Sequence, residues 1–422
     1  MTLRSEGAMA ECETRTEEAR IAALFARPMT QYRAGQCALA AKALFFSSLL
    51  GPGPRPILLG PSAFVLWPRR HLGLHRREDW VHPDGMADCL LGLDAGSRGV
   101  RCSVVPIDGG PVTSSARGWL PKAVPRAGFF AFDMDPAVCW RLLSETVREA
   151  MARAKVAPSH VLGMAASGMR FSLLLLDEDG HTLFAVPNQD ARAAEHAIKL
   201  SDSQGPAFRR RTGHWPTPIS MAPRLQFLAT NAAALVTQAA SALSLSDWIG
   251  YRLAGARLTS PSQAGATLLF DLDSGDWAWD LVDHLSIPRR LLPAVQESGT
   301  QLGGLIRPAA EALGLLAGTP VVMGGADTQC ALLGTGAVAP GQVGIIAGST
   351  TPVQLVTDWP GPRDESRLWN GHHCVPHRWV LETNAGPMGH TLEWFAATLY
   401  PGSNDGVARF MAEAARSDIG AD

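Results

Sequence analysis

The chain has 422 residues, of which 46% are hydrophobic, and its formal net charge is −2 at pH 7. A chain of this length and composition can bury two hydrophobic cores of ordinary size. The nearly balanced charge excludes a strongly basic surface of the kind that neutralises a nucleic-acid backbone. We therefore predict two domains that act on a small molecule, with no nucleic-acid partner.

The seven cysteines are odd in number and scattered, and no two of them form a CxxC pair. This pattern indicates neither a disulfide framework nor a zinc site. It is typical of a protein in a reducing compartment, so we expect a cytoplasmic location.

Residues 1–85 form a poorly patterned N-terminal extension, in which proline-rich stretches such as 51–56 interrupt the apolar runs. The apolar run over 37–50 contains Lys42 and is shorter than the roughly 20 residues that a membrane-spanning helix needs. We therefore predict no membrane role. Met86 immediately precedes the first clear strand, and we hypothesise that it is the functional start.

The first clear element is a hairpin with a turn rich in glycine. Residues 89–94 read as a buried strand, 96–99 as a tight turn and 100–107 as a second strand, with Asp94 at the mouth of the hairpin. A matching pattern recurs over 343–353, where an apolar run breaks at Gly-Ser-Thr and then resumes. Such turns concentrate backbone amides and hydroxyls, which suit them to binding phosphate.

Helices alternate with strands in the rest of the chain. Asp135 followed by Pro136 is a typical helix start, and apolar residues at helical spacing follow it. The other predicted elements are strands over 161–166, 172–177 and 318–325, and helices over 223–230, 232–253 and 328–333. Asp327 lies at the junction between the last of these strands and the last helix. The alternation predicts an α/β fold.

Several motifs together resemble those of one enzyme family. DAGSRGVR at 94–101 resembles the first phosphate motif of the FGGY carbohydrate kinases, and GGADTQCA at 324–331 with GSTT at 348–351 resembles the later nucleotide-site motifs. Between them, in the family's order, lie PNQDAR at 187–192, SDWIGYRLAG at 246–255 and TLLFDL at 267–272. Because several motifs occur in order, the resemblance is more specific than any single motif.

The resemblance implies an α/β protein with the two-domain actin/hexokinase-like (ribonuclease H-like) fold. The sugar-binding domain would cover residues 86–333, and part of the nucleotide-binding domain would cover residues 334–422. The second domain would be incomplete, because the family continues beyond the helix resembled by 391–397 into a glycine-rich segment that holds adenine.

The same resemblance implies ATP-dependent phosphorylation of a sugar or polyol hydroxyl, with ATP and Mg²⁺ as cofactors. Asp94 and Asp327 would hold the metal, and Asp327 would also be catalytic. The residues implied to face the phosphates of ATP are Gly96, Ser97, Arg101, Gly348, Ser349 and Thr350. The residues implied to contact or frame the sugar are Met169, Arg170, Asn188, Asp190 and Arg192.

One position departs from the family pattern that we infer. The resemblance places the general base at an Asp just before the segment that precedes the LLFDL strand, and Ser260 stands at that position here. No Asp or Glu lies between Asp247 and Asp271. Loss of a general base typically costs about 100- to 10,000-fold in rate. Asp327 or a substrate-assisted route would then have to receive the proton.

Three functions therefore remain open. The first is an active sugar kinase, and the second is a catalytically impaired relative that binds a sugar for regulation. The third is a non-functional fragment from a split or degraded gene. An incompletely covered second domain would expose apolar surface and favour association, so a homodimer is also open.

Some of these residues also have structural interpretations. Asp327 can cap a helix, and Asp190 with Arg192 can form an ordinary ion pair. Asp247 is better explained by a capped helix than by a site. The histidine-rich segment 372–377 does not indicate a metal site, because adjacent residues of an extended segment point to opposite faces.

Overall fold

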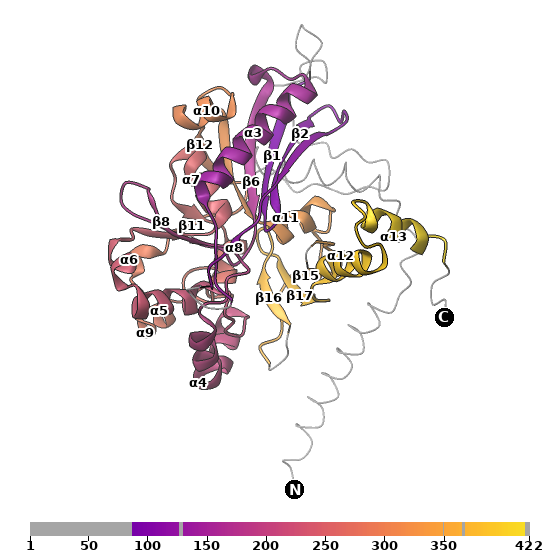
Figure 1. Cartoon of the computed structure of the whole chain (residues 1–422). Coiled ribbons are helices and arrows are strands. Elements are labelled where there is room, and N and C mark those ends of the chain that lie inside the picture. The colour runs from indigo at the N-terminus through magenta and orange to yellow at the C-terminus, as the bar shows by residue number, and fades with distance from the viewer. Residues whose placement is uncertain (1–86, 126–129, 349, 365–367, 418–422) are drawn as a thin grey trace. The chain divides into compact units, whose positions relative to one another are not determined.

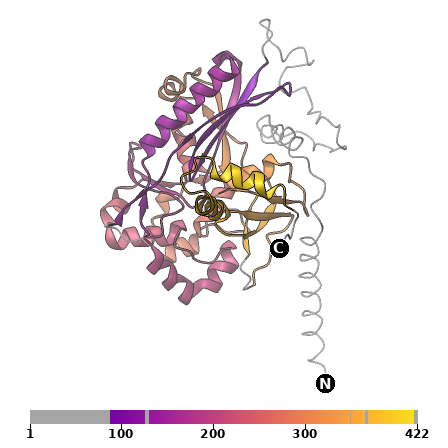
Figure 2. The ribbon, with the colours of Figure 1, turned by 45° about the vertical axis from the view of Figure 1, so that its right-hand side comes forward.

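The computed structural model describes residues 87–125, 130–348, 350–364 and 368–417, which all belong to the compact unit Leu39–Asp422 (Figures 1 and 2). The predictions for residues 1–85 and for Ser349 lie outside the described residues. Within the described part of the chain, no helix has the length and apolar character needed to cross a bilayer.

A six-stranded sheet in the order β12-β13-β6-β1-β2-β3 forms the centre of the larger core. Its strands are β1 Cys89–Gly96, β2 Gly99–Pro106, β3 Thr113–Gly118, β6 Val161–Gly168, β12 Gln301–Gly304 and β13 Pro320–Ala326. β6 pairs in parallel with both β1 and β13, whereas the other pairs are antiparallel. The sheet and the helices packed against it confirm the predicted α/β class.

The first predicted hairpin is confirmed as β1–β2. Along β1, Leu91, Leu93 and Ala95 are buried and alternate with partly exposed residues, as the period of a strand requires. The chain reverses at Gly96, which pairs with Gly99. A Cβ atom on Gly99 would lie 2.5 Å from the carbonyl oxygen of Arg117 on β3, so this position has room only for glycine.

The predicted helix after Asp135 is α3 Pro136–Ala154, which lies along β2 and β3 (Figure 1). The Asp135 carboxylate accepts hydrogen bonds from the backbone amides of Ala137 and Val138, which caps the helix. Its apolar stripe, including Leu143 and Val147, is buried in the larger core. The cap and the apolar spacing were both readable in the sequence.

A three-stranded sheet in the order β8-β7-β9 separates the larger core from a second apolar core, because alternate residues of its strands belong to one core or the other. Its strands are β7 Leu173–Leu176, β8 Thr182–Val186 and β9 Ser241–Leu243. The helices of this part of the chain are α4 Ala194–Thr212, α5 Met221–Asn231, α6 Ala233–Gln238, α7 Leu245–Ala254, α8 Pro261–Ala264 and α9 Trp279–His284. The shorter elements are β4 Lys122–Ala123, β5 Phe132–Asp133, β10 Leu258–Thr259, β11 Ala294–Val295 and α10 Arg307–Leu313, with 3-10 turns at Pro158–His160, Gly265–Thr267 and Arg289–Leu291.

The prediction of a continuous helix over 232–253 is wrong. The segment folds as α6, the strand β9 and α7. β9 pairs antiparallel with β7, so that Ala242 lies opposite Leu175. The helical preference of the alanine-rich segment is overridden because pairing with β7 satisfies its backbone and buries its side chains.

A four-stranded antiparallel sheet in the order β14-β15-β17-β16 follows α11 Asp327–Gly334. Its strands are β14 Val343–Ile345, β15 Pro352–Thr357, β16 Trp369–His372 and β17 Trp379–Asn384. β14 pairs with β15, which confirms the second predicted hairpin.

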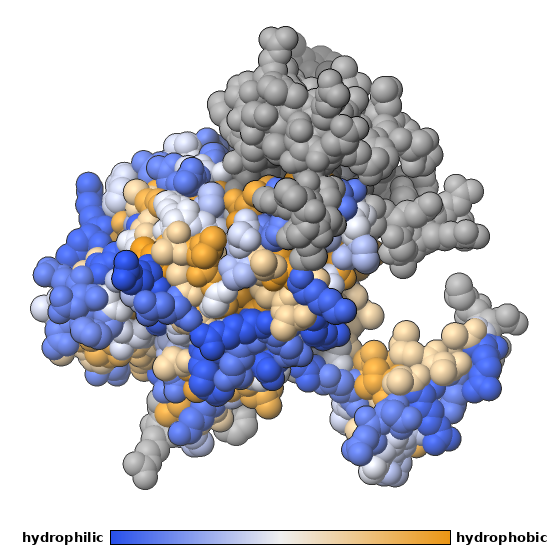
Figure 3. Space-filling view, turned by 90° about the horizontal axis from the view of Figure 1, so that it is seen from above, coloured by the Kyte–Doolittle hydropathy of each residue, from blue (hydrophilic) through white to orange (hydrophobic). Residues whose placement is uncertain are grey.

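The described part of the chain ends with α12 Met388–Leu399 and α13 Gly406–Ala414. Several large apolar side chains on these two helices are exposed, and hydrophobic residues gather on one side of the pair in Figure 3. The most exposed are Met388, Trp394, Leu399 and Met411. An apolar surface of this kind favours association.

Candidate active site

Two acidic side chains reach the same edge of the central sheet because their strands flank β6. Asp94, near the end of β1, pairs in register with Ser167 of β6. On the other side of β6, Gly325 of β13 pairs with the same serine, and Asp327 begins α11 two residues later. Since the three strands run in parallel, their carboxyl ends meet at one edge.

Asp94 is held by the neighbouring strand. The Ser167 hydroxyl donates a hydrogen bond of 2.8 Å to Asp94 Oδ1. Burial raises the pKa of Asp94, although the Ser167 hydrogen bond and the charge of Arg101 act in the opposite direction. The carboxylate is therefore fixed in position by a neutral donor.

Asp327 is the second carboxylate of this edge. Burial raises the pKa of Asp327 to about 7, and the negative charges of Asp94 and Glu382 act in the same direction. The Arg170 guanidinium and the backbone amide of Thr328 oppose the rise. A carboxyl group with a pKa near neutrality can accept a proton under physiological conditions.

The pair also fits a divalent cation. Mg²⁺ is typically held in proteins through one or two carboxylates, with water and substrate phosphates as further ligands. Asp94 and Asp327 supply hard oxygen donors and act on each other electrostatically. The donor chemistry of this edge therefore suits Mg²⁺.

Arg170 connects this edge to the four-stranded sheet. Its Nη1 and Nη2 atoms donate to the two carboxylate oxygens of Glu382 on β17, at 2.8 and 2.7 Å. Gln354 of β15 donates a further hydrogen bond of 2.6 Å to the same carboxylate. Glu382 was not predicted from the sequence. The only available signal was an acidic residue directly after the apolar run Trp379–Leu381.

A narrow cavity lies beside this ion pair, lined by Arg170, His214, Gln329, Trp369 and Glu382 together with small residues. Its volume is about 10 Å³, which holds no more than about one water molecule. Burial and the charges of Arg170 and Arg209 lower the pKa of His214 to about 3, so this ring is neutral. A sugar cannot enter here unless the segments on either side of the cavity separate.

The residues predicted to bind phosphate lie at the two hairpins. Ser97 is half-buried in the β1–β2 turn, and Arg101 is exposed on β2 opposite Asp94. Gly96 offers its carbonyl oxygen to the Trp119 indole, at 2.9 Å. Asp94 lies two residues before Gly96 on β1, so the turn and the carboxylate belong to the same end of this hairpin.

The second turn is more open. Gly348 and Thr350 are exposed, and the Gly348 amide donates to the Thr350 carbonyl oxygen at 3.1 Å. The phosphate-binding roles of these residues remain predictions.

The predicted sugar residues fall into different environments. The Met169 side chain is fully buried in the larger core, next to the ion-paired Arg170. Asn188 is half-buried, and its Oδ1 atom has no hydrogen-bond partner among the described residues. An unpartnered buried acceptor costs free energy, and a ligand hydroxyl can satisfy it. Among the described predicted sugar residues, the buried side-chain oxygens without a hydrogen-bond partner are Asn188 Oδ1 and Asp190 Oδ2, and only the latter faces an arginine, Arg224.

Asp190 and Arg192 belong to a buried polar network. Asp190 Oδ1 accepts hydrogen bonds from the Phe132 amide at 3.0 Å and from Arg192 Nε at 2.7 Å. Arg224 approaches the other carboxylate oxygen, with Nε 3.4 Å from Oδ2, and donates to the Pro187 carbonyl. The network holds the loop after β8 against β5, so it frames the neighbouring Asn188.

We predict that Asp190→Asn destabilises the protein by about 2 kcal/mol, because the amide retains an acceptor but removes the charge that faces two arginines. Urea unfolding followed by tryptophan fluorescence measures the loss. Asp179→Asn, on an exposed turn, is the matched control and should leave the midpoint unchanged. An Asp190→Asn variant with normal stability and only a weakened sugar affinity would contradict the structural role.

Ser260 is fully buried and caps α8. Its hydroxyl oxygen accepts a hydrogen bond from the Gln263 amide at 3.3 Å and lies 3.0 Å from the Ser262 hydroxyl. This hydroxyl is engaged by its own helix. The position therefore offers no group that could receive a proton from a substrate.

Two other motifs have structural roles. Ser244 and Asp247 form a reciprocal capping box at the start of α7, as predicted. Burial lowers the pKa values of His372 and His373 to about 4, so both rings are neutral. His373 accepts a hydrogen bond from the Val375 amide at 2.9 Å and lies 3.1 Å from the Ala337 carbonyl oxygen. This histidine is satisfied within the fold.

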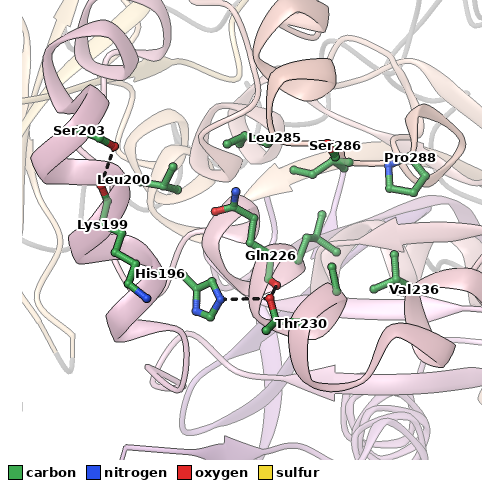
Figure 4. A pocket seen from close by; sticks show the side chains of 13 residues that line it. His196, Lys199, Leu200, Ser203, Gln226, Thr230, Val236, Leu285, Ser286 and Pro288 are labelled. Atoms are coloured by element: carbon green, nitrogen blue, oxygen red, sulfur yellow. Dashed lines mark hydrogen bonds between the residues drawn. The ribbon is translucent and has the colours of Figure 1, made fainter.

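A larger cavity, with a volume of about 340 Å³, lies elsewhere (Figure 4). Residues of α4 and α5 and of the segment after α9 line it, including Leu200, Gln226 and Pro288. The Thr230 hydroxyl lies 3.5 Å from His196 Nε2 at its margin. None of the predicted site residues lines this cavity.

Comparison with known proteins gives a consistent result. Residues 89–334 match the FGGY family of carbohydrate kinases, N-terminal domain. An autoinducer-2 kinase of Escherichia coli is 33% identical over 311 residues, which cover 72% of this chain and 58% of that protein. The chain thus spans 58% of the length of that relative.

Two solved structures share the fold. The xylulose kinase from Rhodospirillum rubrum has a TM-score of 0.68 at 26% identity, covering 79% of this chain and 68% of that protein. The Plasmodium falciparum glycerol kinase with ADP has a TM-score of 0.67 at 16% identity, covering 77% of this chain and 66% of that protein. These likenesses confirm the predicted two-domain actin/hexokinase-like fold class.

Proposed function

Because the chain belongs to the FGGY family of carbohydrate kinases, we propose that it transfers the γ-phosphoryl group of ATP to a hydroxyl group of a sugar or polyol. The observation that carries the proposal is the pair Asp94 and Asp327 at one edge of the central sheet. Phosphoryl transfer needs a cation on the phosphates and a group that orients or deprotonates the attacking hydroxyl. These two carboxylates can divide the two tasks.

Asp94 is the proposed ligand of Mg²⁺, through bound water or directly. When bound, Mg²⁺ would neutralise charge on the phosphates of ATP. The turn that contains Gly96 and Ser97 offers amides and a hydroxyl beside Asp94, and Arg101 adds a positive charge. Gly348, Ser349 and Thr350 are proposed to bind the phosphates from the second hairpin.

Asp327 is the proposed general base. Its pKa of about 7 lets the carboxylate accept the proton of the sugar hydroxyl near neutral pH. Arg170 lies close enough to Asp327 to stabilise its charged form. The buried hydroxyl of Ser260 has no comparable capacity, and we therefore assign the base to Asp327.

A change at Ser260 tests this assignment. We expect that Ser260→Asp does not raise kcat, because the position is fully buried and its side chain caps α8. The new carboxylate should instead lower stability, since burying an unpaired charge is costly. Turnover assays and urea unfolding measure both effects, with Ser260→Ala as the control for the lost cap. An increase in kcat would contradict the assignment to Asp327 and indicate that position 260 is the site of the general base.

The sugar is proposed to bind between Arg170 and Asn188, which has an unpartnered acceptor. The related proteins are named as kinases of autoinducer-2, xylulose and glycerol, so the acceptor class is a small ketose or polyol. Because the cavity beside Arg170 holds about one water, we propose that the four-stranded sheet moves away from Arg170 to admit the sugar.

The experiment incubates the full chain with Mg-ATP and a panel of pentuloses, aldonates and polyols, and follows ADP release by a coupled assay. Sugar-dependent ADP release supports the kinase. Isothermal titration that detects sugar binding with no ADP release would favour the regulatory alternative, and absence of both would favour a non-functional fragment. A cytoplasmic location and a homodimer formed through the apolar face of α12 and α13 are further proposals, which cell fractionation and sedimentation velocity test.

A further inference from the structure

Two cysteines from distant parts of the sequence meet behind the candidate active site. Cys330 lies on α11, one turn after Asp327, and Cys374 lies just after β16. Their Sγ atoms are 3.7 Å apart. The other described cysteines are Cys89, Cys102 and Cys139, all fully buried in the larger core.

The thiol pair packs against the junction that carries Asp327. Cys374 Sγ lies 3.9 Å from the Ser262 hydroxyl, which accepts a hydrogen bond of 3.1 Å from the Ala326 amide. A Cβ atom on Gly325 would lie 3.0 Å from Cys374 Sγ. Because of this close packing, a displacement of the Cys374 sulfur would shift the residues immediately before Asp327.

The separation is close to that of a disulfide. A disulfide has an S–S length of about 2.05 Å, so each sulfur would move by only about 0.8 Å. Cys330 is partly exposed, which gives a small oxidant access to one sulfur, whereas Cys374 is buried behind it. We propose that Cys330 and Cys374 are a redox modification site, which a low-molecular-weight disulfide converts reversibly into an intramolecular disulfide bond.

The reaction is two successive thiol–disulfide exchanges. The hydrogen bond with Cys374 and burial raise the pKa of Cys330, so only a small fraction of this thiol is ionised at neutral pH. The Cys330 thiolate of that fraction attacks one sulfur of the oxidant RSSR, a mixed disulfide forms, and RS⁻ leaves. The Cys374 thiolate then attacks Cys330 Sγ, the Cys330–Cys374 bond forms, and the second RS⁻ leaves. The two protons of the protein thiols end on the two released RSH molecules. The protein is oxidised by two electrons and the oxidant is reduced by two.

The new bond would tie α11 to the segment that follows β16. Arg170, just after β6, and Glu382, on β17, already join the central sheet to the four-stranded sheet by an ion pair, which can open and close. A covalent bond cannot open without a reductant. This consequence rests on the proposed function: the oxidised chain admits sugar less easily, because the four-stranded sheet can no longer move away from α11.

The test treats the full chain with oxidised glutathione under native conditions, blocks the remaining thiols and maps the peptides by mass spectrometry. We expect the Cys330–Cys374 cross-link in most molecules, whereas Cys139 should remain a free thiol. Treatment with dithiothreitol should remove the cross-link. Cys330→Ser and Cys374→Ser should abolish the cross-link. Cys139→Ser, also at a buried position, is the matched control and should retain it.

Two results would overturn the site: a mixed disulfide at Cys330 that never resolves, or cross-links that involve other cysteines equally often. The peptide map needs no enzymatic activity, so it tests whether the disulfide forms even if the kinase proposal fails. In the turnover assay, we expect the oxidised chain to be at least five-fold slower and to recover with dithiothreitol. Equal rates for the cross-linked and reduced chains would overturn the regulatory consequence.

Discussion

Asp327→Asn is expected to lower kcat for phosphoryl transfer by about 100- to 10,000-fold, because the amide cannot accept the proton of the sugar hydroxyl. Asparagine keeps an oxygen that can accept the hydrogen bond of 2.8 Å from the Thr328 amide. The fold should therefore persist, and the midpoint of thermal unfolding should stay close to that of the parent. Steady-state turnover with saturating sugar and Mg-ATP measures the loss.

The pH dependence separates a base from a residue that only positions the substrate. A base must be ionised, so kcat/KM for the parent should fall as pH drops below about 7, the raised pKa of Asp327. The residual activity of Asp327→Asn should lack this acid limb. Asp179→Asn, which changes an exposed aspartate, should retain both the rate and the limb. Normal turnover by Asp327→Asn would reject the assignment of the base.

Arg170→Met is expected to destabilise the protein by about 3 to 5 kcal/mol, because it leaves the Glu382 carboxylate buried without its ion-pair partner. The side chains of Arg170 and Glu382 are only 11% and 2% exposed, so solvent screens the pair weakly. Urea unfolding of the parent and the variant measures the difference. The variant should also raise the pKa of Asp327 further, since Arg170 opposes that rise.

A double variant tests whether the unpaired Glu382 carboxylate causes the loss of stability in Arg170→Met. Arg170→Met with Glu382→Gln should recover most of the lost stability, because the amide removes the unpaired charge and still accepts the hydrogen bond from Gln354. The control is Arg289→Met, which breaks an exposed ion pair with Asp283 and should produce no measurable change. If the double variant were as unstable as Arg170→Met, the loss would come from packing of the arginine against Phe171 and Trp369.

Much of the local structure was predictable from neighbouring residues. The alternation of β1, the glycines of its turn and the Asp135 cap each act over a few residues, so the sequence displays them directly. The segment 232–253 was predicted wrongly for the opposite reason. Its middle becomes a strand only because β7 is present to pair with it.

The candidate site was predictable in its residue types more than in its contacts. Asp94 and Asp327 were identified from glycine-rich motifs, and the structure brings them to one edge. The partnership of Arg170 with Glu382 joins residues 212 positions apart, and no periodicity links them. The same holds for the interaction of Asp190 with Arg224.

The sequence by itself determined the α/β class, both hairpins, the cap of α3 and the resemblance to the FGGY family, because each depends on local periodicity or on a short motif. The tertiary structure alone decided that Asp94 and Asp327 share one sheet edge, that Arg170 pairs with Glu382 and that Cys330 lies beside Cys374. These contacts depend on the parallel register of β6 with its neighbours and on how the four-stranded sheet packs. Burial there raises the pKa of Asp327, an effect that residue identity alone cannot reveal.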